Sequence, residues 1–268
     1  MSSTDRYFHA SDARLRYRDE GAGAAIVWLH GWTLDLEVWE PQCTEFRASM
    51  RVVRPDRRGF GLSTGSPDPA ADPDDLLALF DHLQIARAAL VGMSQGARAA
   101  LAFALAHPQR VASLVLDGPP NPADGAEAAE EISFGEYRTL IEAGGIGAFR
   151  DAWRAHPLMR LYSADDAARA LVDRMLGRYR GLDLLQPAPP APPFDLHALR
   201  RLRLPVLVIN GQLDTVERRS AADQLCRDIQ GARRALVPGA GHLANLDQPR
   251  AYNDIVRAFI QRPSSVAA

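Results

Sequence analysis

Short apolar runs recur along the chain, and stretches with helical periodicity separate them. Because these runs do not alternate with polar residues, they predict strands that are buried on both faces. Strands that alternate with helices predict a parallel sheet with helices on both of its faces. The expected strands span residues 25–29, 51–53, 88–91, 111–116, 206–209 and 235–237, and the expected helices span 37–48, 74–83, 95–106, 217–229 and 244–261.

The alternation stops in residues 119–199, which contain helical patches and no strand-like run. We therefore expect a helical cap over 119–199, inserted into an α/β core that is formed by 1–118 and 200–268. The insertion ends in the proline-rich segment 186–193, which cannot form an ordinary helix. The aromatic residues of the insertion either pack the cap against the core or line a substrate pocket, and both interpretations stay open. Phe134, Tyr137 and Trp153 are the candidates for such a pocket.

Composition narrows the class of partner. The 268 residues carry a net charge of -2, and all 31 basic residues are arginines interspersed with acidic residues. Without a long basic stripe we expect a small-molecule partner and no nucleic acid.

The two cysteines, Cys43 and Cys226, do not indicate a disulfide framework. No secretory signal is evident in the first ten residues and no apolar segment is long enough to span a bilayer, so we expect no membrane association and a cytoplasmic protein.

A serine lies between two glycines directly after the apolar run 88–91, in Gly92-Met93-Ser94-Gln95-Gly96. A strand that turns sharply into a helix exposes its serine, and the turn needs small residues on either side. An alanine- and leucine-rich run over 97–106 supplies the helix. Ser94 is therefore the candidate nucleophile.

A serine hydroxyl needs a base within hydrogen-bond reach, and the base needs an acid to fix its tautomer. His242 lies in a glycine-rich loop after the last expected strand, whereas His82 and His107 fall in or at the end of expected helices. Two aspartates follow expected strands, Asp214 after 206–209 and Asp117 after 111–116. The chain order Ser, Asp, His favours Asp214 as the acid, with Asp117 as the competing candidate.

Acyl transfer also requires N–H donors for the oxyanion. Gln95 follows the nucleophile at the start of a helix, so its backbone N–H is one candidate donor. The tripeptide His30-Gly31-Trp32 follows the first expected strand, and the backbone N–H of Trp32 is the second. Trp32 is also a candidate substrate-binding residue, and His30 is expected to be a structural partner of the loop.

These motifs, in this order, resemble those of the α/β-hydrolase superfamily over nearly the whole chain. The segment 56–63, which reads DRRGFGLS, is similar to the family's structural turn after its fourth strand. The resemblance implies a mostly parallel, doubly wound sheet with a helical cap insertion, and it places the acid and the histidine at Asp214 and His242. Within the superfamily the chain is similar to small-ester carboxylesterases and enol-lactonases. Arg98 departs from the small or apolar residues usual in the helix after the serine, and either a structural role or a role in specificity would explain it.

The expected function is cleavage of a carboxylic ester or lactone through an acyl-enzyme on Ser94. One alternative keeps the same three residues for carbon-carbon bond hydrolysis or elimination on a diketone-like substrate. Another is a ligand receptor with the same fold and no hydrolysis, because a fold does not fix a function. No metal or organic cofactor is suggested, since the histidines and aspartates that would bind a metal are already used or scattered.

Overall fold

The structure is a computed structural model that describes residues 4–121, 132–189 and 193–261. Its centre is an eight-stranded sheet with the strand order β1-β2-β4-β3-β5-β6-β7-β8. The strands from β4 to β8 in this order run parallel to one another. At the other end of the sheet, β2 is antiparallel to both of its neighbours, β4 and β1. The strands are β1 Arg6–Ala10, β2 Ala13–Glu20, β3 Ala25–Leu29, β4 Arg51–Pro55, β5 Ala88–Met93, β6 Val111–Asp117, β7 Val206–Gly211 and β8 Arg233–Val237.

All six expected strands are confirmed, as β3 to β8. The hairpin of β1 and β2 is absent from the sequence-based expectation, because these strands contain no continuous apolar run. In β2 the buried residues Ala13, Leu15 and Tyr17 alternate with arginines, which is the period-two pattern of a strand with one apolar face. That alternation was the feature of the sequence from which β2 could have been predicted.

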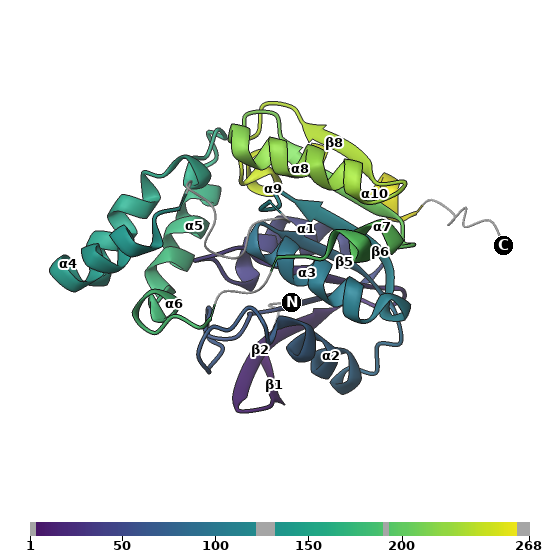
Figure 1. The fold of residues 1–268 in the computed structure, drawn as a ribbon, viewed down its shortest axis with the longest axis horizontal. Coiled ribbons are helices and arrows are strands. Elements are labelled where there is room, and N and C mark those ends of the chain that lie inside the picture. Colours follow the sequence, from purple (N-terminus) through teal and green to yellow (C-terminus); the bar gives the residue numbers. More distant parts are fainter. Residues whose placement is uncertain (1–3, 122–131, 190–192, 262–268) are drawn as a thin grey trace.

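Helices cover both faces of the sheet (Figure 1). Side chains of successive strand residues point to opposite faces, so Ile26 and Trp28 join one core cluster while Val27 and Leu29 join the other. The first cluster includes residues of α1, α9 and α10, and the second includes residues of α2, α3, α7 and α8. These helices are α1 Glu40–Phe46, α2 Asp72–His82, α3 Gln95–Ala106, α7 Leu196–Arg201, α8 Val216–Asp228, α9 Ala244–Asp247 and α10 Pro249–Ile260.

The single helix expected over 244–261 is wrong in one respect, since the structure divides it into α9 and α10. Gln248 lies between them with φ -136° and ψ 63°, outside the helical region. Pro249 follows, and a proline disfavours the helical conformation of the residue before it. The first expected helix, over 37–48, likewise begins as a 3₁₀ turn, η1 (Leu36–Trp39), before α1.

Between β6 and β7 the described residues form helices and no strand. These are α4 (Phe134–Arg154), the 3₁₀ turn η3 (Pro157–Met159), α5 (Asp166–Arg178), α6 (Leu182–Leu185) and α7. Figure 1 shows α4, α5 and α6 gathered on one side of the sheet. Residues 122–131 and 190–192 of the expected cap lie outside the described residues. Among the helices that are described, none combines the length and apolar character that a membrane span requires.

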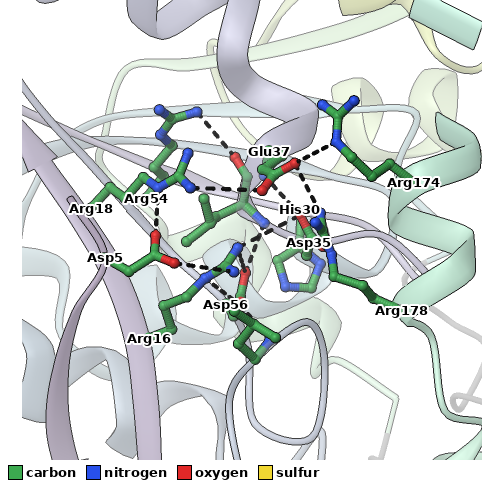
Figure 2. A network of polar contacts seen from close by, with 12 residues as sticks. Asp5, Arg16, Arg18, His30, Asp35, Glu37, Arg54, Asp56, Arg174 and Arg178 are labelled. Atoms are coloured by element: carbon green, nitrogen blue, oxygen red, sulfur yellow. Dashed lines mark hydrogen bonds and ion pairs between the residues drawn. The ribbon is translucent and has the colours of Figure 1, made fainter. Parts of the chain in front are cut away.

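Arginines of α5 join this helical segment to the loop that follows β3 (Figure 2). Arg178 lies 2.7 Å from an Asp35 carboxylate oxygen and 2.9 Å from Glu37, and Arg174 lies 3.3 Å from Glu37. Asp35 also accepts a hydrogen bond from the Glu37 N–H and so caps η1. The same ion pairs therefore attach α5 and fix the start of η1.

A second carboxylate, that of Asp56, also binds the loop that follows β3 (Figure 2). Its oxygens accept the backbone N–H groups of Leu36 and Leu62 at 2.8 Å each, and Arg16 Nε lies 2.9 Å away. Burial, and then the charge of Asp35, raises the pKa of Asp56 to about 7. Arg16 is almost completely buried and opposes this shift.

We expect Arg178→Met to lower the free energy of unfolding by about 1–3 kcal/mol, because it leaves the buried Asp35 carboxylate without its strongest partner. Methionine keeps the aliphatic length of the arginine, so little packing is lost. Urea denaturation followed by circular dichroism measures the change. Arg169→Met on the same helix is the control, since Arg169 pairs with the exposed Asp166 and should cost less than about 0.5 kcal/mol. Equal losses in both variants would show that the Asp35 contact does not stabilise the fold.

Candidate active site

Ser94 lies at the sharp turn between β5 and α3. Its backbone has φ 54° and ψ -118°, a conformation that residues other than glycine rarely adopt. The turn is tight enough to require both glycines of the motif. A Cβ atom on Gly92 would lie 2.2 Å from the Gly96 carbonyl oxygen, and one on Gly96 would lie 2.3 Å from that of Leu29. The glycine spacing of the sequence is therefore explained by contact between backbones.

His242 and Asp214 lie on loops at the carboxyl ends of neighbouring strands, after β8 and β7. His242 Nδ1 is 3.1 Å from Asp214 Oδ1 and 3.3 Å from Oδ2. The carboxylate also accepts hydrogen bonds from Asn210 Nδ2 at 2.7 Å and from the Thr215 N–H at 2.9 Å. Because an ionised carboxylate only accepts, Nδ1 is assigned the proton and Nε2 is left as the acceptor.

The electrostatics of Asp214 favour its ionised form. Burial acts to raise its pKa, but the charge of His242 and the hydrogen bonds from His242, Asn210 and Thr215 lower it further than burial raises it. The pKa of Asp214 thus lies below its ordinary value. A permanently charged acceptor at this position holds the imidazole in one orientation.

Asp117, the competing acid, is placed differently. Its side chain is fully buried at the end of β6, beside the Tyr252 hydroxyl, and the structure pairs His242 with Asp214 instead. Burial, and then the charge of Asp214, raises the pKa of Asp117 well above its ordinary value. Its backbone has a separate use, since the Asp117 carbonyl accepts the Ser94 N–H at 2.7 Å.

The two residues expected to bind the oxyanion, Trp32 and Gln95, line the same cavity as Ser94. Gln95 is the first residue of α3, where backbone N–H groups have no partner within the helix. Gly31 allows the loop that carries Trp32 to approach, because a Cβ atom on Gly31 would lie 3.3 Å from Ser94 Cβ. A larger residue at position 31 would move this loop away from the serine.

His30 is a structural partner of that loop, and its hydrogen bonds identify its tautomer. Nε2 accepts the Arg57 N–H at 2.9 Å, so Nδ1 donates to the Gly31 carbonyl at 2.8 Å. Burial, with the charge of Arg57, lowers the pKa of His30 to about 3. The ring is therefore neutral and fixed in place.

Ser94 and His242 open on one cavity, which is also lined by Trp32 and Gln95. Among the described residues, the side-chain hydrogen bonds of His242 go to Asp214 and none joins it to the Ser94 hydroxyl. Such catalytic contacts commonly tighten only when substrate binds. Much of the remaining wall is apolar and comes from the segment between β6 and β7 and from the loop after β8. It includes Phe134, Trp153, Leu158, Met159 and Leu243.

Tyr137, also expected in the pocket, is not among the described residues that line this cavity. It packs behind the lining, with its ring centroid 6.2 Å from that of Trp32 and 5.7 Å from that of Trp153. Trp32 itself contacts Trp153 edge to face at 4.6 Å, and its Nε1 donates to Asp183 at 2.5 Å. The aromatic residues thus both pack the segment onto the core and line the cavity.

Three further residues of the site had no distinct signal in the sequence. Asn210 is an ordinary residue at the end of a strand until its bond to Asp214 is seen. Gly118 must lack a side chain, since a Cβ atom there would lie 2.7 Å from His242 Cε1. Arg57, in the expected structural turn, pairs with Asp72 and donates to Gln95 Oε1 at 3.2 Å.

Residues 26–255 match the alpha/beta hydrolase family. The chain belongs to this family. A protein of Bacillus subtilis (strain 168), provisionally named 2-succinyl-6-hydroxy-2,4-cyclohexadiene-1-carboxylate synthase, is 29% identical over 92% of this chain and 94% of its own. The 3-oxoadipate enol-lactonase 2 of Acinetobacter baylyi (strain ATCC 33305 / BD413 / ADP1) is 26% identical over 94% of this chain and 95% of its own. A thermophilic esterase from Thermogutta terrifontis, in its malate-bound structure, is 25% identical with a TM-score of 0.78, over 96% of this chain and 98% of its own.

The family assignment and the esterase and lactonase relatives support hydrolase activity for this alpha/beta hydrolase. The fold class expected from the sequence is confirmed. Within the described residues, no group of three or more His, Cys, Asp or Glu is arranged to hold a metal ion.

We expect Asp117→Asn to become more stable relative to the wild type as the pH rises from about 5 to about 8. Because the folded state holds the Asp117 proton more tightly than the unfolded state does, the contribution of this group to wild-type stability falls with rising pH. Asparagine has no such dependence, and the difference should grow by up to about 1.4 kcal/mol per pH unit until Asp117 ionises. Urea denaturation of both proteins at several pH values measures it. A difference that does not change with pH would mean that Asp117 is ionised in the fold.

Proposed function

We propose that this alpha/beta hydrolase is a serine hydrolase that cleaves a carboxylic ester or lactone of a small molecule. The observation that carries the proposal is that the strained turn at Ser94 and the His242 imidazole line one cavity, while the Asp214 carboxylate is bonded to that imidazole. The family match and the enol-lactonase relative support this reaction class. Because another similar protein is provisionally named as a synthase, the reaction needs a test of its own.

In the proposed mechanism, His242 Nε2 takes the proton from the Ser94 hydroxyl as the oxygen attacks the scissile carbonyl. The backbone N–H groups of Trp32 and Gln95 stabilise the oxyanion, and His242 then protonates the leaving group. The resulting acyl-enzyme is hydrolysed by water that His242 activates. Asp214 stays ionised throughout and stabilises the imidazolium.

We also propose that residues 119–199 act as a cap on a core formed by 1–118 and 200–268. The apolar side chains that this segment contributes to the cavity wall support this division, because they exclude water from the acyl-enzyme. On this proposal Trp32, Phe134 and Trp153 contact substrate, while Tyr137 supports Trp32 from behind. The substrate is a small molecule that fits beneath the cap.

A substrate panel separates this proposal from its rivals. Simple esters and lactones should be turned over many times, whereas vinylogous diketones should not. Preference for the diketones would indicate carbon-carbon bond hydrolysis by the same residues. Stoichiometric binding without turnover would indicate a receptor.

We expect Ser94→Ala to lose nearly all ester hydrolysis, by about 10³-fold or more in kcat, because the nucleophile is removed. The variant should also lose covalent labelling by a fluorophosphonate, read as a mass increase on the intact protein. Ser49→Ala is the control, since Ser49 is exposed and far from the turn in sequence, and it should be labelled like the wild type. Wild-type turnover of a chromogenic ester by Ser94→Ala would overturn the assignment of the nucleophile.

Asp214→Asn should lower kcat/KM by about 10³-fold or more with the fold intact, because an amide cannot stabilise the imidazolium. Asp117→Asn removes no contact to His242 and should change kcat/KM less than about tenfold. Steady-state kinetics on one ester, with circular dichroism as the check on folding, compares the two. The reverse ranking would transfer the role of the acid to Asp117.

A further inference from the structure

Trp32, whose backbone N–H is one of the two groups proposed to bind the oxyanion, is buried. Among residues 4–121, 132–189 and 193–261, no acceptor receives a hydrogen bond from this N–H. Nearly all buried backbone N–H groups in folded proteins are paired, so a buried N–H with no acceptor, on the wall of the Ser94 cavity, is suited to a negative charge that develops during the reaction. Its effect depends on how firmly the Trp32 peptide is held.

The residues on either side of Trp32 do not fix that peptide by themselves. Gly31 has no side chain to anchor it, and Thr33 has φ 63°, which is unfavourable for a β-branched residue. Such a conformation persists only where the contacts around it impose it. The position of the Trp32 N–H is therefore set by the contacts of the side chains in this loop.

Those contacts come from the helical segment between β6 and β7. The Asp183 carboxylate, in α6, accepts the Trp32 indole N–H at 2.5 Å through Oδ2 and the Tyr179 hydroxyl at 2.6 Å through Oδ1. Trp153, in α4, donates from Nε1 to the Thr33 hydroxyl at 2.8 Å. Two consecutive residues of the loop are thus bonded to side chains that lie 151 and 120 residues away in sequence.

The bond to Asp183 differs from the bond between Trp153 and Thr33, because its acceptor is a carboxylate. Hydrogen bonds to charged acceptors are stronger than those between neutral groups. Burial raises the pKa of Asp183, and the hydrogen bonds from Tyr179 and Trp32 oppose that rise. Aromatic rings also enclose the indole, but packing is weakly directional, whereas a hydrogen bond fixes where the N–H end of the ring lies.

We propose that Asp183 is a positioning residue of the oxyanion hole: it holds the Trp32 indole and thereby keeps the Trp32 backbone N–H where the oxyanion forms. The inference rests on the proposed function and adds a residue to it. Because packed side chains enclose the indole, the ring cannot change rotamer freely, and a displaced indole displaces the peptide to which it is joined. The helical segment thus contributes to the reaction as well as covering the cavity.

The kinetics of Asp183→Ala test this role. An interaction that acts in the transition state lowers kcat and kcat/KM together, so both should fall about tenfold or more for p-nitrophenyl butyrate, with KM changed less than about twofold. Asp183→Asn keeps an oxygen acceptor and should restore part of the rate. Asp173→Ala in α5 is the matched control, because Asp173 is exposed and pairs with Arg154, and it should keep the wild-type constants. An unchanged kcat in Asp183→Ala would overturn the proposal.

A double-mutant cycle shows whether Asp183 acts through the indole. Trp32→Phe removes the indole N–H and keeps a ring and the backbone N–H. In that background Asp183→Ala should lower kcat less than about threefold, because the bond it breaks is already absent. Tyr179→Phe removes the other bond of the carboxylate and keeps the indole contact, so it should also change kcat less than about threefold. If the losses from Asp183→Ala and Trp32→Phe multiply, Asp183 acts by another route and the assignment is wrong.

Fluorophosphonate labelling separates loss of the fold from loss of position. A folded Asp183→Ala variant should be labelled to completion like the wild type, but about tenfold more slowly, because the phosphonyl oxygen enters the same oxyanion hole. Labelling at the wild-type rate would contradict the proposal. If Asp183→Ala is not labelled to completion, Asp183→Asn, which keeps the shape of the side chain, decides the test: its kcat should lie at least about threefold below that of the wild type, and an equal kcat would overturn the role.

A measurement without turnover distinguishes failure of this inference from failure of the proposed function. The four tryptophans give four indole signals in proton–nitrogen NMR spectra, and Trp32→Phe identifies the signal of Trp32. Asp183→Ala should shift this signal more than the other three, because the indole loses its charged acceptor. If the wild type hydrolyses no ester and the signal shifts, the proposed function fails, and the positioning role with it, while the contact stands. If the wild type is active and Asp183→Ala keeps its kcat, the positioning role alone fails.

Discussion

The structure of the site depends on a strained backbone at one residue. Ser94 is held at φ 54° and ψ -118°, which costs about 1–3 kcal/mol for a residue with a side chain, and the surrounding structure must supply that energy. β5, with partners on both edges, fixes the residue before the turn, α3 fixes the residue after it, and the Asp117 carbonyl accepts the Ser94 N–H. Because Gly92 and Gly96 permit backbone contact, strand and helix meet closely enough to hold the serine out toward the cavity.

Buried ionic contacts position the loop that must face this serine. Asp56 ties the backbone of Leu36 to the turn after β4, and Asp35 joins the same loop to α5 through Arg178 (Figure 2). Every cation in these contacts is an arginine, whose several fixed donors can satisfy two acidic groups at once. The loop that carries Trp32 is thereby attached to both the sheet and the helical segment, so its position relative to Ser94 depends on both.

Much of this arrangement could be predicted from the sequence, for reasons that are local. Parallel strands buried on both faces leave continuous apolar runs, and the turn at Ser94 needs its glycines within five residues of each other. What could not be predicted depends on contacts between distant segments. Gly118 is required by the His242 ring, which lies far away in sequence, and Asn210 acquires its role only through Asp214. The hairpin strand β2 left a different kind of signal, an alternation of apolar residues with arginines, of which Arg16 is buried and paired with Asp56.

The choice between Asp214 and Asp117 shows how position decides chemistry for one residue type. Asp117 ends β6 and Asp214 lies in the loop after β7, its parallel neighbour, and the two carboxyls are close enough for the charge of Asp214 to act on Asp117. Asp214 accepts hydrogen bonds from the Asn210 amide, from the Thr215 backbone N–H and from the His242 imidazole, so its ionised form is stabilised despite burial. Burial and the negative charge of Asp214 favour the protonated form of Asp117, and they outweigh the hydrogen bond from Tyr252, which acts in the opposite direction. Two carboxylates this close would repel each other, and the neutral Asp117 allows a single negative charge to face His242 without a competitor.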